Sequence, residues 1–159
     1  MTEKLYYQNP YQKTFEAQVL SCEEKNGTFL IELDRTAFYP EGGGQPGDKG
    51  LMENVPVTDV HEKGGIILHT CTSPLSPGST VHCSIDWLRR FDHMQQHSGE
   101  HIVSGMLCSS FRCDNVGFHM GEETVTIDYN TEISWEDLLG IEEKANAYIW
   151  EGHELSEKF

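Results

Sequence analysis

Three histidines spaced four residues apart, His93, His97 and His101, are the residues of this chain best suited to chemistry. The surrounding sequence predicts one helix, in which residues four apart lie almost above one another and two imidazole rings can contact the same ion. Zinc favours this arrangement because neutral imidazole is a good zinc ligand. His97 and His101 form the better pair, since the small residues Ser98 and Gly99 leave space around an ion. We therefore predict a zinc site with His97 and His101 as ligands, and a supporting role or a place at the helix start for His93.

A zinc site needs three or four protein ligands, and one helix supplies only two of them. The other side chains considered as ligands are two histidines and two cysteines: His119, His153, Cys108 and Cys113. Cys108 follows His101 by seven residues, which places it two helical turns away, too far to share an ion. Glu100 is a candidate general base, but its position about 100° from each neighbour does not require it to face the metal.

A glycine-rich segment over residues 36–50 is the second candidate site. Its five glycines and two prolines exclude a regular helix or strand. Adjacent glycines allow positive φ angles and close approach of the backbone to a ligand, and Gln45 adds a directional amide. Composition alone leaves open both a ligand-binding loop and a mobile surface turn. The segment is not a phosphate-binding P-loop, because it lacks the terminal Lys-Ser/Thr pair.

The elements that position these residues follow from the hydrophobic pattern. Alternating apolar residues on both sides of the turn at residues 25–27 predict a β-hairpin. Further short strands fit residues 55–60, 66–71 and 80–86, and strands at this spacing are typical of a small barrel or sandwich. From residue 86 the period becomes helical, so a helix over residues 88–109 carries the histidines.

Two strands and a second helix are expected after this histidine-bearing helix. The strands fit residues 116–120 and 123–129, and Ser134 is the expected N-cap of a helix that runs to about Trp150. His119 lies on the first of these strands, which can cross the helix. It is therefore a candidate for the wall of a pocket or for a further ligand.

The change of pattern near Trp87 divides the chain into two expected domains. Residues 1–87 are predicted to form a β-barrel domain with the glycine-rich loop, and residues 88–159 an α+β domain, so the fold class is mixed β and α+β. The second part has only two strands and two helices, and the chain stops where another strand could start, in residues 154–159. We therefore expect the chain to be a fragment of a longer protein.

Composition and charge narrow the function further. The net charge of −15, from 11 basic and 26 acidic residues, counts against broad binding of a nucleic-acid backbone. It does not exclude recognition of one nucleotide end in a small pocket. The acidic excess of the C-terminal part is expected on a solvated helix face. There is no apolar run of about 20 residues and no secretion signal, so we expect no membrane contact. The five cysteines show no Cys-x-x-Cys spacing, so we expect reduced thiols and a cytoplasmic protein.

Three separated motifs, in the same order, resemble those of one family. They are the glycine-rich segment, the sequence from Asp86 to Arg90 followed by the His97-x-x-x-His101 motif, and residues 117–122. Together they resemble the editing half of alanyl-tRNA synthetases and the free-standing AlaX-type editing proteins. The resemblance implies a barrel like that of translation factors, joined to the editing domain shared by threonyl- and alanyl-tRNA synthetases. It implies zinc-dependent hydrolysis of serine or glycine wrongly attached to alanine tRNA, with the charged tRNA acceptor end as partner.

The resemblance also assigns residues to the site. His97 and His101 would hold the zinc ion. The residues beside the bound amino acid and tRNA end would be Gly42, Gly43, Gly44 and Gln45, with His119 in the pocket. The family completes its zinc site with a later Cys-x-x-x-His pair that this chain lacks, and it often has Thr or Gln in place of Glu100. We therefore expect the fragment to hold zinc weakly and to be inactive alone, with the missing part supplying ligands and any oligomer contact. Through its synthetase members, the family is also associated with ATP binding.

Two other functions stay open. A non-catalytic module that binds the tRNA acceptor end would need the fold and the pocket but no hydrolysis. A metallohydrolase of another small ester or amide would use the same histidine pair on a different substrate. The sequence does not distinguish serine from glycine as the amino acid removed.

Overall fold

The computed structural model describes residues 1–155, and the chain divides into two compact units, Met1–His93 and Met94–Phe159. The division falls within helix α1, Trp87–Phe111. Strands and helices are both present, which confirms the predicted mixture of β and α structure. Glu157 of the acidic tail and the expected strand start beyond residue 155 lie outside the described residues.

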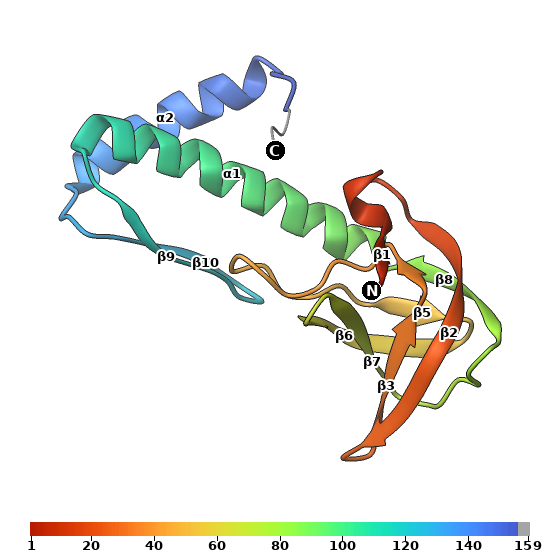
Figure 1. Cartoon of the computed structure of the whole chain (residues 1–159). Helices are drawn as coiled ribbons and strands as arrows, with labels where there is room; N and C mark the ends of the chain where they lie inside the picture. The colour runs from red at the N-terminus through yellow and green to blue at the C-terminus, as the bar shows by residue number, and fades with distance from the viewer. Residues whose placement is uncertain (156–159) are drawn as a thin grey trace. The chain divides into compact units, whose positions relative to one another are not determined.

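Six antiparallel strands form the main sheet of the first unit (Figure 1). They are β2 (Thr14–Lys25), β3 (Thr28–Leu33), β5 (Gly50–Met52), β6 (Val55–Lys63), β7 (Ile66–Cys71) and β8 (Thr80–Ile85). Their order is β2-β3-β7-β6-β5-β8, and the sheet closes into a barrel because β8 pairs with β2. The turn between β2 and β3 uses positive φ angles at Asn26 and Gly27, as a tight hairpin requires. Outside the barrel, β1 (Glu3–Lys4) pairs with β4 (Arg35–Thr36), and a short 3-10 helix spans Leu5–Tyr7.

The barrel core of the first unit is mainly apolar, but it also contains buried polar side chains, of which His69 is one. Strand residues alternate between the core and the surface except at bulges, and side chains such as Ile31 and Val60 are fully buried. His69 lies among them, also fully buried. Its Nδ1 donates to the Ile31 carbonyl at 2.9 Å, and its Nε2 accepts from the Thr36 hydroxyl at 2.9 Å. The Thr36 hydroxyl oxygen in turn accepts a hydrogen bond from the Phe38 amide. Burial lowers the pKa of His69 to about 4, so this ring is neutral and structural.

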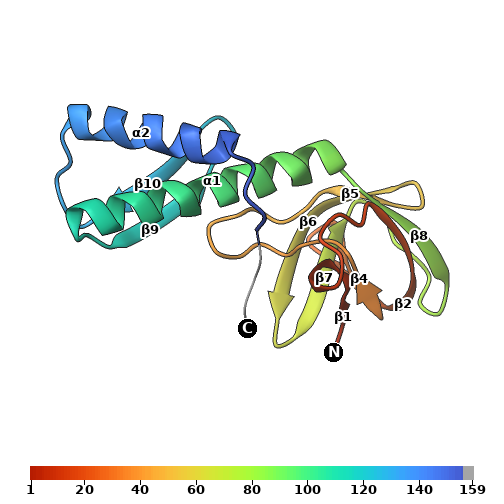
Figure 2. The same ribbon diagram turned by 90° about the horizontal axis from the view of Figure 1, so that it is seen from above.

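The second unit contains the later turns of α1, a hairpin and a second helix. Strands β9 (Asn115–Met120) and β10 (Val125–Tyr129) pair antiparallel, and α2 spans Trp135–Trp150. Helix α2 runs beside the later turns of α1 in both views (Figure 2). A cavity of about 400 Å³ is lined by residues of α1, β10 and α2, most of them apolar.

Helix α2 starts where its sequence predicts. Ser134 is the N-cap, and its hydroxyl accepts a hydrogen bond from the Asp137 amide at 3.1 Å. The acidic residues of this region that the structure describes are exposed: Glu132, Glu136, Asp137, Glu142, Glu143, Glu151 and Glu154. The predicted solvated face is confirmed for them. No helix within residues 1–155 combines the length and the apolar character needed to cross a bilayer.

Candidate metal centre and glycine-rich loop

His97 and His101 lie side by side on helix α1 within the second unit. Their ring centroids are 5.0 Å apart and their planes differ by 22°. His97 is partly buried, whereas the side chain of His101 is 74% exposed. The spacing of four residues therefore brings both rings to one face of the helix, as a shared ion requires.

Glu100 joins the two histidines. One ligand atom from each of His97, Glu100 and His101 can be chosen so that all lie within 4.8 Å of one another, a group able to hold a metal ion. The Glu100 side chain is only 4% exposed, and its Oε2 lies 3.1 Å from Nδ1 of His101. Sequence spacing alone did not require this orientation, because adjacent helical residues point about 100° apart. One feature of the sequence could have predicted the orientation of Glu100. Ser104 follows it by one helical turn on the same face, and its hydroxyl can donate to the Glu100 carboxylate.

The surroundings of His97 keep its ring neutral. Burial lowers the pKa of His97, the neighbouring His101 lowers it further, and Glu100 partly opposes both effects. The ring of Phe118 on β9 covers it, with centroids 5.4 Å apart. A neutral imidazole with an available nitrogen lone pair is the form that binds zinc.

The other predicted ligands are not part of this group. His119 is exposed on β9, next to Phe118, and successive strand residues face opposite sides of the hairpin. Cys108 and Cys113 interact with each other, and burial and Cys108 together raise the pKa of Cys113. His153 lies 2.7 Å from a Glu151 carboxylate oxygen. The roles proposed for His119 in a substrate pocket stay predictions.

His93 is the last residue of the first unit. It is buried, and its Nδ1 has no hydrogen-bond partner among the described residues. Burial lowers the pKa of His93, and the nearby positive charge of Arg89 acts in the same direction.

The glycine-rich loop of the first unit is an ordered tight turn. Gly42 and Gln45 exchange two backbone hydrogen bonds of 3.0 and 3.1 Å. Between them, Gly43 and Gly44 have φ angles of 59° and 81°, in the region that favours glycine. The turn itself therefore explains the glycines at positions 43 and 44, and the side chain of Gln45 is buried.

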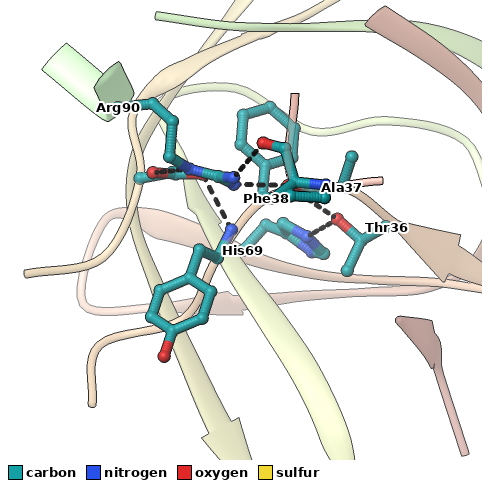
Figure 3. A network of polar contacts seen from close by, with 8 residues as sticks. Thr36, Ala37, Phe38, His69 and Arg90 are labelled. Atoms are coloured by element: carbon teal, nitrogen blue, oxygen red, sulfur yellow. Dashed lines mark hydrogen bonds and ion pairs between the residues drawn. The ribbon is translucent and has the colours of Figure 1, made fainter. Parts of the chain in front are cut away.

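A buried ion pair holds the base of this loop to the first turn of α1 (Figure 3). Nε of Arg90 donates to both carboxylate oxygens of Asp48 at 2.8 and 2.9 Å, and a terminal nitrogen also contacts this carboxylate. The same terminal nitrogen donates to the Ala37 carbonyl at 2.6 Å, and the Tyr39 amide donates to Asp48 at 2.8 Å. This pair was not predicted from the sequence, because Asp48 and Arg90 are 42 positions apart.

Comparison with known proteins places the chain in a family. The model of the tRNA synthetases class II (A) family matches residues 2–89. The chain belongs to this family. Relatives named alanyl-tRNA editing proteins, and alanine-tRNA ligases, extend the similarity over nearly the whole chain and identify it as an AlaX-type editing domain.

Three relatives illustrate how far the similarity of this editing domain reaches. The alanyl-tRNA editing protein AlaX-L of Pyrococcus horikoshii is 34% identical over 156 residues, which are 94% of this chain and 39% of that protein. The alanyl-tRNA editing protein Aarsd1 of Rattus norvegicus is 33% identical over 91% of this chain and 39% of its own length. The alanine-tRNA ligase of Pyrococcus furiosus is 37% identical over 97% of this chain and 18% of the ligase. The editing domain therefore spans about two fifths of these editing proteins and less than a fifth of the ligase.

Proposed function

We propose that this chain takes part in zinc-dependent hydrolysis of serine or glycine wrongly attached to alanine tRNA. The observation that carries the proposal is the group of His97, Glu100 and His101, on a chain whose relatives are named alanyl-tRNA editing proteins. The barrel of the first unit then corresponds to the translation-factor-like barrel of the family. The proposed action on tRNA would take place in the cytoplasm.

The side chains of the group fit a zinc ion. Imidazole nitrogens are donors that zinc accepts, and His97 and His101 would hold the ion, with the Glu100 carboxylate beside His101. When bound, the ion supplies Lewis-acid polarisation of an ester carbonyl. An aminoacyl ester is already activated, so the remaining requirements are a positioned water molecule and correct orientation of the substrate.

The chain's own residues have distinct parts in this proposal. Burial lowers the pKa of His97 and thereby favours its neutral form, and the Phe118 ring lies against it. The proposed role of the glycine-rich loop, with Gly42, Gly43, Gly44 and Gln45, is to lie beside the charged tRNA end, as the resemblance to the family implies. A pocket that hydrogen-bonds the serine hydroxyl would reject alanine, because its polar groups would lose their partner.

Deacylation by the full-length gene product tests this function. Serine-charged and glycine-charged alanine tRNA are incubated with the zinc-loaded protein, with His97→Ala, and with His153→Ala as the matched control outside the group. We expect hydrolysis by the unsubstituted protein and by His153→Ala, and loss of hydrolysis in His97→Ala.

Three results would contradict the proposal, one from this experiment and two from parallel assays of tRNA binding and of small-ester hydrolysis. Binding of the tRNA end without hydrolysis would indicate a non-catalytic binding module. Zinc-dependent hydrolysis of other small esters or amides only would indicate a different metallohydrolase. Hydrolysis that persists in the His97→Ala variant would show that the metal centre is not required for the reaction.

A further inference from the structure

The Glu100 carboxylate is buried on helix α1, an unusual position for this side chain. Only 4% of it is exposed. A buried carboxylate is costly unless donors surround it. Its partners therefore indicate the function of this residue.

Both carboxylate oxygens of Glu100 contact donors. Oε1 accepts from the Ser104 hydroxyl at 2.5 Å and from Nδ2 of Asn115 at 2.7 Å. Oε2 lies 3.1 Å from Nδ1 of His101. The Tyr129 hydroxyl, 2.8 Å from the Ser104 hydroxyl, extends the network.

This network spans three elements of the second unit. Ser104 lies one helical turn after Glu100, on the same face of α1. Asn115 begins β9, and Tyr129, its partner in register, ends β10. The hairpin and the helix thus hold the Glu100 side chain in one orientation, with its second oxygen at the imidazole of His101.

We propose that Glu100 is a positioning residue that fixes the tautomer of His101. A neutral imidazole carries hydrogen on one nitrogen and a lone pair on the other, and an ionised carboxylate only accepts. Nδ1 of His101 therefore donates to Glu100, and Nε2 presents its lone pair to the metal. A carboxylate in this position also raises the basicity of the ligating nitrogen. The inference builds on the metal centre of the proposed function.

The same contacts distinguish this role from direct coordination by Glu100. Its Oε1 already accepts from Ser104 and Asn115, and its Oε2 faces a ring N–H. Three of the about four lone-pair positions of the carboxylate are therefore occupied, and a metal bound directly to Glu100 would have only the remaining position on Oε2.

Long-range nitrogen–proton NMR correlations of the metal-free chain test the tautomer directly. The spectra are recorded at alkaline pH, and the two ring nitrogens are distinguished by their chemical shifts. We expect His101 in the Nδ1–H form in the unsubstituted chain, and a shift toward the Nε2–H form in Glu100→Ala. Glu142→Ala, which removes an exposed carboxylate from α2, should leave the His101 signals unchanged. An Nε2–H form in the unsubstituted chain would overturn the proposal.

Glu100→Gln provides the second variant, because its side-chain carbonyl can still accept from Nδ1. We expect this variant to keep the tautomer and to lose about tenfold or more in zinc affinity. The absorption spectrum of bound Co²⁺ should keep its shape, since no ligand is lost. A changed Co²⁺ spectrum would instead make Glu100 a ligand and overturn the positioning role. The tautomer is measured without metal, so failure to bind zinc would contradict the proposed function and not this inference.

Discussion

At the scale of single residues, His69 links the stability of the barrel to pH. Its pKa is about 4 in the folded chain, below the ordinary value of about 6.5 expected after unfolding. The unfolded state therefore binds the extra proton between these values. The stability that depends on neutral His69 is complete above about pH 6.5 and is lost as the pH falls toward 4. The loss is on the order of 3 kcal/mol, from about 1.4 kcal/mol per pKa unit.

Urea unfolding of the unsubstituted chain and of His69→Gln, at a series of pH values, measures this effect. Glutamine does not titrate, so the variant should show a shallower decline of the free energy of unfolding between pH 6.5 and 4. His82→Gln, on an exposed position of β8, is the matched control and should follow the unsubstituted chain. Equal slopes in all three proteins would contradict the structural role of His69.

Contacts within the candidate site could be predicted from the sequence where they depend on local structure, and could not where they depend on tertiary packing. The closeness of His97 and His101 follows from the pitch of one helix, which is a local property. The partners of Glu100 include Asn115 and Tyr129, whose approach depends on how the hairpin packs on the helix. That packing is a tertiary property, which helical spacing alone cannot specify.

At the scale of elements, the buried pair of Asp48 and Arg90 secures the base of the glycine-rich loop. Their side chains are 1% and 3% exposed. Arg90→Met leaves the Asp48 charge buried without its partner, so we expect a loss of about 3–5 kcal/mol in the free energy of unfolding. Arg35→Met removes an exposed pair with Asp34 and should cost no more than about 1 kcal/mol.

A double-mutant cycle with Asp48→Asn isolates the interaction between these two residues. The double variant should lose less stability than the sum of the two single losses, because neither charge is then buried alone. Strictly additive losses, measured by urea unfolding, would show that the pair does not act as a unit.

Helix α2 depends on its N-cap. Ser134→Ala removes the acceptor of the Asp137 amide, and we expect it to cost about 1 kcal/mol in the free energy of unfolding. Ser134→Asn keeps an acceptor at the same position and should retain most of the stability. Urea unfolding followed by circular dichroism measures both variants. The cap would be unimportant if alanine and asparagine behaved alike.

The elements themselves were largely predictable from the sequence, because their patterns are local. The strand at residues 66–71 has the predicted bounds, and the start of α2 follows from Ser134 and the acidic first turn. The order of strands was not predictable, because β5 pairs with β8 as well as with its neighbour β6, and two whole strands separate β5 from β8 in the sequence. Such long-range pairings depend on the whole barrel.

At the scale of the whole molecule, the net charge of −15 limits how the chain holds tRNA. We expect weak binding in which few phosphates are neutralised, so the salt dependence should be shallow. The plot of log affinity against log salt should have a slope below about 2 in magnitude, which corresponds to two or three phosphates. Fluorescence titration of alanine tRNA over a range of salt concentrations measures this slope. A steep slope would reveal a basic surface that the composition does not suggest.

The proposed metal centre requires that His97 and His101 coordinate the same divalent ion. Competition with a chromophoric chelator measures zinc binding to the 159-residue chain most directly. We expect one weakly held zinc per chain, with affinity reduced about tenfold or more in His97→Ala and in His101→Ala but unchanged in His153→Ala. Tight, chelator-resistant zinc that persists in the His97→Ala and His101→Ala variants would contradict it.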